Sequence, residues 1–176
     1  MGMVTILLFV FCVVCTVTDF RRGKVYNALT FPSMLVGLMA HIVIGGFQGA
    51  TFSLLGMGAA LILFFPFFAL KIMGAGDVKM LMAIGALKGA AFALNVAILS
   101  IFVGGMISFF ILLYKGRLLQ TITSIGKLLR SIIVSELEYE PIPLERCMMA
   151  PFAISITVAV FLTQFNVLDV SWLWIY

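Results

Sequence analysis

Long apolar runs constrain the fold of this chain more than any other feature of its sequence. They cover residues 3–18, 28–46, 51–70, 78–87, 90–114 and 148–168. An α-helix needs about 20 residues to cross the hydrocarbon core of a bilayer, and most of these runs approach or exceed that length. Hydrophobic residues make up 64% of the chain and charged residues only 10%, whereas soluble domains contain roughly 45–50% apolar residues. The sequence therefore predicts an integral membrane protein that is embedded in the lipid bilayer.

The six runs predict an all-α fold, namely a polytopic bundle of about six transmembrane helices that forms a single domain over residues 1–176. Run 3–18 follows no basic segment and has no small-residue cleavage site, so we expect a retained helix rather than a signal peptide. Run 78–87 is too short to cross a bilayer by itself. We expect it either to extend past Lys88 or to begin below the membrane surface.

Basic residues gather on one side of the predicted bundle. If the N-terminus faces outward, only Lys88 among the 11 lysines and arginines lies on the outer side. The inner side carries Arg21, Arg22, Lys24, Lys71, Lys79, Lys115, Arg117, Lys127, Arg130 and Arg146. Positive charge collects on the cytoplasmic side of membrane proteins, so we expect a multi-pass protein of the cell membrane with both termini outside. This asymmetry accounts for the net charge of +4 without a nucleic-acid partner.

The longest inner connection, residues 115–146, has a pattern of its own. Its apolar residues between positions 118 and 133 fall on one half of a helical wheel, and its basic and polar residues fall on the other. A basic amphipathic helix of this kind is expected to lie in the membrane interface. An acidic stretch follows it, with Glu136, Glu138 and Glu140. We interpret this stretch either as a solvated connector or as a contact for a basic segment of a partner.

Two acidic residues lie at the inner ends of apolar runs. Asp19 follows run 3–18, and Asp77 precedes run 78–87 within KIMGAGDVKMLMAIG. Two runs separate them, which is an even number of crossings, so both carboxylates are expected on the same face. Ionisable groups in membrane-like sequence are costly and are therefore candidate functional groups. The structural alternative is a pair of ordinary helix caps, in which the helix dipole favours the charge of Asp77.

The glycines that precede Asp77 favour a functional role over capping alone. Gly74 and Gly76 allow the backbone to turn sharply or to approach another chain closely. This freedom fits a bound substrate strand better than it fits a bare helix cap.

Two carboxylates that meet in such a bundle would share one proton, because like charges at short range push their pKa values apart. One group can then act as base and the other as acid, and together they activate water against a peptide carbonyl, as in aspartic proteases. His41 is the single histidine and is predicted toward the opposite face, where packing or a hydrogen bond is its expected role. Cys12 and Cys15 lie inside an apolar run and are expected to be small core residues. No metal site and no cofactor is predicted.

The motifs around the two aspartates resemble the type IV prepilin peptidase family of GxGD aspartyl proteases. GAGDVKMLMAIGA, residues 74–86, is similar to the second aspartate motif of that family. TDFRRGKVYN, residues 18–27, is similar to the first, with Asp19 eight residues before Asn27. Val25 and Tyr26 stand where the family more often has Ile-Pro. MAPFAIS, residues 149–155, resembles the opening of its last helix.

This resemblance implies a fold, an activity and a substrate. Asp19 and Asp77 would be the catalytic dyad of a membrane aspartic endopeptidase, with Gly74, Gly76, Lys79 and Asn27 as supporting motif residues. The substrate would be a prepilin-like precursor, whose short basic leader is cleaved at the cytoplasmic face. Bifunctional members of the family carry a large insertion with paired C-x-x-C zinc sites after the first helix and also methylate the new N-terminus. Only DFRRGKVYN stands there in this chain, so we expect the short, peptidase-only branch without N-methyltransferase activity.

Two other functions fit part of the pattern. A protease that resembles signal peptide peptidase would cut within a transmembrane helix, but that group pairs its GxGD motif with a Tyr-Asp motif on the preceding helix. A small ion- or proton-coupled transporter or channel could use Asp19 and Asp77 as cation sites. Such proteins place carboxylates nearer the midplane and often contain inverted repeats, which this sequence lacks.

Overall fold

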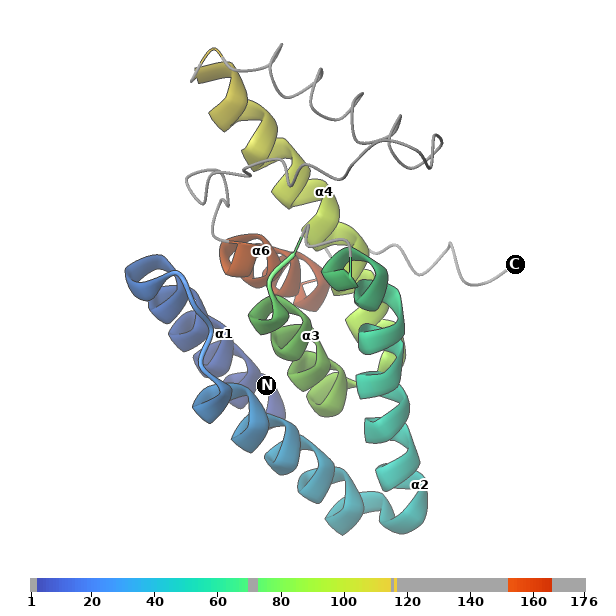
Figure 1. The fold of residues 1–176 in the computed structure, drawn as a ribbon. Coiled ribbons are helices and arrows are strands. Elements are labelled where there is room, and N and C mark those ends of the chain that lie inside the picture. The colour runs from blue at the N-terminus through green and yellow to red at the C-terminus, as the bar shows by residue number, and fades with distance from the viewer. Residues whose placement is uncertain (1–2, 70–72, 115, 117–151, 166–176) are drawn as a thin grey trace, which may run out of the picture. The chain divides into compact units, whose positions relative to one another are not determined.

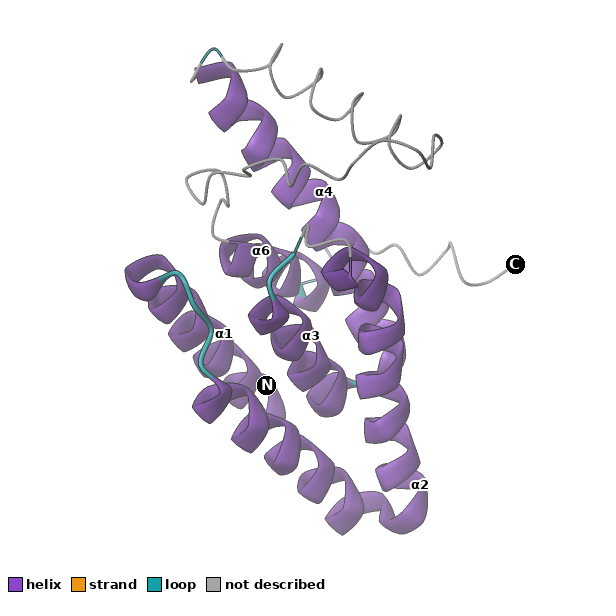
Figure 2. Ribbon diagram, viewed as in Figure 1, coloured by secondary structure: helices purple, strands orange, loops and turns teal. Residues whose placement is uncertain are grey.

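The computed structural model describes residues 3–69, 73–114, 116 and 152–165, and it is all-α in this part of the chain. The helices are α1 (Met3–Arg22), α2 (Asn27–Ala69), α3 (Ala75–Lys88), α4 (Ala90–Tyr114) and α6 (Phe152–Gln164) (Figures 1 and 2). The predicted amphipathic helix over 118–133 and the acidic stretch with Glu136, Glu138 and Glu140 lie outside the described residues. Both therefore remain predictions.

Three of the helices are long and apolar enough to cross a membrane. They are the segments Val4–Arg22, Asn27–Ala69 and Ala90–Ile111. Many of their exposed side chains are large and apolar, as lipid-facing side chains must be; on α1 these include Ile6, Val10 and Val13. The structure thus supports a helical membrane protein. That the chain crosses the membrane six times remains a prediction.

Helix α2 joins two of the predicted runs into one helical stretch that bends sharply at Gly46. The backbone there has φ 56° and ψ −131°, a conformation that glycine adopts at little cost. We define the first arm as residues 27–45 and the second arm as residues 47–69. The chain turns back at the bend, so that Gly49 lies against the backbone of His41. The approach is so close that a Cβ atom on Gly49 would collide with the carbonyl group of His41. Figure 1 shows the two arms running in different directions from the bend.

Helix α3 packs between the two arms of α2 through glycine contacts. A Cβ atom on Gly37 in the first arm would lie 2.9 Å from the carbonyl carbon of Ala86. A Cβ atom on Gly56 in the second arm would collide with the carbonyl oxygen of Gly85. Small residues allow helix backbones to approach closely in membrane proteins, where packing rather than the hydrophobic effect drives association. The arms therefore fix the position of α3.

Polar side chains of both arms also hold the C-terminal end of α3. The Nε2 atom of His41 lies 3.1 Å from the carbonyl oxygen of Leu87, and the hydroxyl of Ser53 donates to the carbonyl of Ala86 at 3.0 Å. The last carbonyl groups of a helix have no partner within it, so these bonds satisfy groups that would otherwise be unpaired. The expected hydrogen-bonding role of His41 is confirmed.

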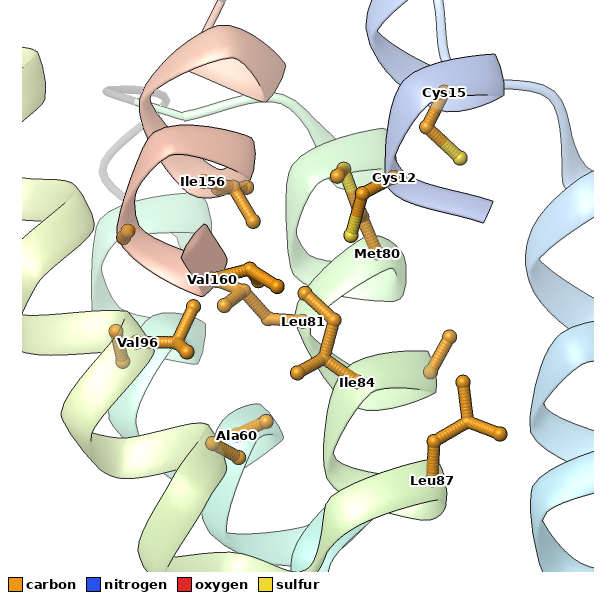
Figure 3. Close-up of a cluster of buried hydrophobic side chains, with 14 of the residues drawn as sticks. Cys12, Cys15, Ala60, Met80, Leu81, Ile84, Leu87, Val96, Ile156 and Val160 are labelled. Atoms are coloured by element: carbon orange, nitrogen blue, oxygen red, sulfur yellow. The ribbon is translucent and has the colours of Figure 1, made fainter. Parts of the chain in front are cut away.

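The core surrounds α3, which is buried on nearly all sides. Met80, Leu81 and Ile84 of this helix are fully buried, and Figure 3 shows them beside side chains of α1, α4 and α6. Cys12 and Cys15 are also fully buried, so their expected role as small core residues is confirmed. Because α3 lies inside the protein, it does not need the length of a lipid-exposed span.

The bounds of α3 settle how the short fourth run is arranged. The helix begins at Ala75, ahead of run 78–87, and ends at Lys88. Gly89 follows with φ 84° and terminates it. The alternative that this helix extends past Lys88 was wrong, because the left-handed glycine and the side chains of His41 and Ser53 close its last turn.

Candidate active site

Asp19 lies three residues before the end of α1 and is half-buried. The helix stops because Gly23 adopts φ 61° and donates its N–H to the carbonyl oxygen of Asp19 at 2.7 Å. Glycine commonly ends helices in this left-handed conformation. The Asp19 side chain is thereby held at the end of the helix, beside the connection that leads into α2.

Asp77 lies in the first turn of α3. Gly74 is the N-cap residue, with φ −73° and ψ 147°, and no side chain caps the helix from that position. The backbone N–H of Asp77 donates to the carbonyl of Gly74 at 3.2 Å, and the carboxylate of Asp77 accepts a hydrogen bond from the backbone of Gly74. An acidic side chain three residues after the N-cap reaches back in the same way in a capping box. Asp77 therefore does cap α3, as the structural alternative expected.

The two carboxylates are close enough to interact. Asp77 lies outside the three candidate spans. Burial raises the pKa of its carboxyl group to about 7, and the negative charge of Asp19 raises it further. The hydrogen bond from Gly74 acts in the opposite direction and lowers this pKa. A carboxyl group with a pKa near neutrality is partly protonated at physiological pH and can donate a proton. The charge of Asp19 at the end of α1 thus acts on Asp77 at the start of α3, while the catalytic role of the pair stays a prediction.

The connection between α1 and α2 packs directly beside Asp77. A Cβ atom on Gly76 would lie 3.0 Å from the Cβ atom of Val25. Gly76 belongs to the first turn of α3 and is not among the glycines with positive φ. The close approach at Gly76 is therefore to Val25 of the same chain, and the backbone there has no left-handed conformation; an approach of a substrate strand stays a prediction.

Two further motif residues meet across the same end of the bundle. The ammonium group of Lys79 in α3 donates to the amide oxygen of Asn27 at 2.9 Å, and Asn27 is the first residue of α2. Lys79 also lies over the ring of Phe31, 5.4 Å from its centroid. The lysine thus ties the start of α3 to the start of α2, which supports the arrangement of Asp77 from outside the core.

The structure adds a residue that the sequence reasoning missed. The backbone of Ala153, at the start of α6, hydrogen-bonds to the carboxylate of Asp19. The first N–H groups of a helix have no partner within it and favour negative charge. The apolar segment MAPFAIS gives the only sequence signal, because Pro151 is typical of a helix start. Nothing in that signal identifies Asp19 as the partner.

A pair of carboxyl groups with one pKa near neutrality is chemically suited to acid–base catalysis. Among the residues that the structure describes, no group of three or more His, Cys, Asp or Glu side chains is arranged to hold a metal ion. The carboxylates of Asp19 and Asp77 each accept a backbone hydrogen bond from a helix N-terminus. These hydrogen bonds orient both carboxylates, while burial raises the pKa of Asp77 to about 7.

Comparison with known protein families identifies a match that covers both aspartates. A model of the type IV leader peptidase family matches residues 6–109, a segment that contains both aspartates, helices α2 and α3 and all but the first three residues of α1. No curated protein and no solved structure matches the chain.

Proposed function

This chain belongs to the type IV leader peptidase family, and we propose that the protein is a membrane aspartic endopeptidase. Its proposed reaction is the cleavage of the leader from prepilin-like precursors at the cytoplasmic face. The observation that carries this proposal is the interaction of Asp19 at the end of α1 with Asp77 at the start of α3. We further propose that residues 1–176 act as a single integral-membrane peptidase domain with both termini outside. The basic residues of its inner connections support that orientation.

In the proposed mechanism the two carboxylates hold one proton and one water molecule between them. Asp77, with its pKa raised to about 7, supplies the acidic proton. Asp19 receives a hydrogen bond from the backbone of Ala153, which orients its carboxylate, and it accepts a proton from the water. The water oxygen attacks the peptide carbonyl while Asp77 protonates the carbonyl oxygen. The proton on Asp19 then passes to the leaving amine as the peptide bond breaks, and one hydroxyl of the tetrahedral intermediate returns its proton to Asp77, which restores the starting state of the pair.

The surroundings of the pair weigh against the transporter alternative. A cation site needs oxygen ligands that converge on the ion, whereas both carboxylates lie against backbone donors at the N-terminal ends of α3 and α6. Those donors already occupy part of the acceptor capacity of Asp19 and Asp77. They are better suited to orient a carboxylate than to release it to a cation.

The short connection between α1 and α2 supports the proposal that this enzyme does not methylate its product. The connection comprises residues 23–26 only, and Val25 within it packs on Gly76. An N-methyltransferase would need a site for a methyl donor, which four residues held against α3 do not provide. We also propose that Glu136, Glu138 and Glu140, outside the described residues, attract the basic leader of the substrate.

The proposed function is tested with the full chain purified into lipid vesicles. We expect it to cut a precursor with a short basic leader into two products, with one cleavage site at the leader boundary. Mass spectrometry identifies the bond, and S-adenosylmethionine added to the reaction should leave the mass of the new N-terminus unchanged. An intact precursor after incubation with folded protein would overturn the proposal. A methylated product would overturn the peptidase-only assignment.

A further inference from the structure

Two threonine hydroxyl groups join α1 to α6 one helical turn before Asp19. The Oγ1 atoms of Thr16 and Thr157 lie 2.6 Å apart, and both side chains are half-buried. The two residues are 141 positions apart in the sequence. A hydrogen bond between side chains of two apolar helices ties the helices together, because it holds only while the two hydroxyl groups stay next to each other.

Both hydroxyl groups also meet the carbonyl oxygen of Ala153. The Oγ1 atom of Thr157 lies 2.9 Å from it and that of Thr16 lies 3.3 Å from it. Each hydroxyl has one proton to donate. Thr157 can therefore donate to Ala153 while it accepts the proton of Thr16, and this arrangement uses both protons. Thr157 Oγ1 also lies 3.4 Å from the carbonyl oxygen of Cys12, so the bridge reaches the backbone of α1 as well.

Ala153 connects this bridge to the candidate active site. The threonines hold its carbonyl group, and its backbone hydrogen-bonds to the carboxylate of Asp19. Ala153 is fully buried and lies in the first turn of α6. A small rotation or shift of that turn would move the donor away from the carboxylate.

We infer that Thr16 and Thr157 are positioning residues, whose hydroxyl bridge fixes the first turn of α6 so that the backbone of Ala153 stays on the Asp19 carboxylate. This inference rests on the proposed function of Asp19. It assigns a role in the reaction to α6, which lies beyond the residues that the family model matches. Neither threonine touches the reacting atoms, so their effect is on the orientation of Asp19.

Thr163 provides a matched control on the same helix. Its hydroxyl donates to the carbonyl of Ala159 at 2.8 Å, which is the same bond to the fourth preceding residue that Thr157 makes to Ala153. The difference is that Thr157 also bridges to Thr16 on α1. Replacing each threonine with valine keeps the branched shape and removes one hydroxyl. Comparison of the two variants separates the bridge from the bond within the helix.

The test measures kcat and KM of precursor cleavage in lipid vesicles. We expect Thr157→Val to lower kcat roughly tenfold, because small displacements of a catalytic group reduce the rate strongly. KM should stay within about twofold, since substrate binding is not altered. Thr157→Ser keeps the hydroxyl and should restore kcat. Thr16→Val should reproduce the loss, and the double valine variant should lose little more than either single variant, because both remove one bridge.

The outcomes of this experiment separate the inference from the proposed function. If the wild type does not cleave the precursor, the proposed function fails. If the wild type cleaves it and Thr157→Val and Thr16→Val match Thr163→Val in kcat, the positioning role is wrong. A serine variant that is as slow as the valine variant would also contradict it. Should Thr157→Val fold poorly, Thr16→Val and Thr157→Ser still decide between the two results.

Discussion

Replacing Asp77 or Asp19 with asparagine is expected to reduce precursor cleavage by roughly 10²–10⁴-fold, the range that general acid–base groups contribute. Asparagine keeps the size of the side chain but cannot exchange a proton. At position 77 its amide oxygen can still accept the hydrogen bond from the backbone of Gly74, so the first turn of α3 should persist. The measurement is the initial rate of cleavage by each variant in lipid vesicles.

Stability should change in the opposite direction from activity at position 77. The folded protein raises the pKa of Asp77 from 3.8 to about 7, so the folded state holds a proton that the unfolded state releases. Wild-type stability contributed by this group therefore falls as pH rises between these two values. Asp77→Asn has no charge to bury and should show no such loss. Thermal unfolding of both proteins at pH 5 and at pH 8, below and above the raised pKa of about 7, measures this difference in stability.

Asp169→Asn removes a carboxylate from the other end of the sequence and should leave cleavage near the wild-type rate. Appreciable processing by either Asp19→Asn or Asp77→Asn would contradict the assignment of these residues as an acid–base pair.

The same substitution at two neighbouring glycines of α2 is expected to have opposite effects on stability. Gly56→Ala should destabilise the protein by about 1–3 kcal/mol or more, as overpacking does, because its Cβ atom would collide with the carbonyl oxygen of Gly85. Gly58→Ala should be neutral or stabilising by up to about 1 kcal/mol, since alanine favours helix over glycine. A Cβ atom on Gly58 meets nothing within 4 Å.

Thermal unfolding and cleavage rates of the two alanine variants test this contact. Gly56→Ala should also lower activity, because a shift of α3 away from the second arm of α2 moves Asp77 with it. Equal melting temperatures for the two variants would show that α3 does not pack on α2 through Gly56 and Gly85.

The sequence predicted the class of fold well and the boundaries of its central helices less well. The apolar composition and the length of its runs were enough to predict membrane helices, because these two properties decide which segments can cross a bilayer. The predicted break between runs 28–46 and 51–70 is present, but the sequence did not show that it is confined to Gly46, with helical residues on both sides. It also did not show that α3 begins at Ala75, since the cap formed by Gly74 and Asp77 became apparent only in the structure.

The candidate site was predictable in part. The parity of crossings placed Asp19 and Asp77 on one face, and the structure gives the two residues interacting charges. The meeting of Lys79 with Asn27 fits their place in the two motifs. The bridge between Thr16 and Thr157 was not predictable, because hydroxyl groups in apolar helices usually bond to their own backbone. Only tertiary structure brings residues 141 positions apart into contact.

The central claim is that the end of α1 and the start of α3 form one site, and a cross-linking measurement tests it most directly. Cysteines replace Asp19 and Asp77 in a chain whose three native cysteines are changed to alanine. The folded protein in lipid vesicles is then treated with a short bismaleimide. A matched pair joins position 77 to Val43, which is 80% exposed near the bend of α2.

We expect a link between positions 19 and 77 and none between positions 43 and 77. Single-cysteine variants labelled with a monofunctional maleimide verify that each position reacts. Efficient labelling at positions 19 and 77 without a cross-link between them would contradict the account.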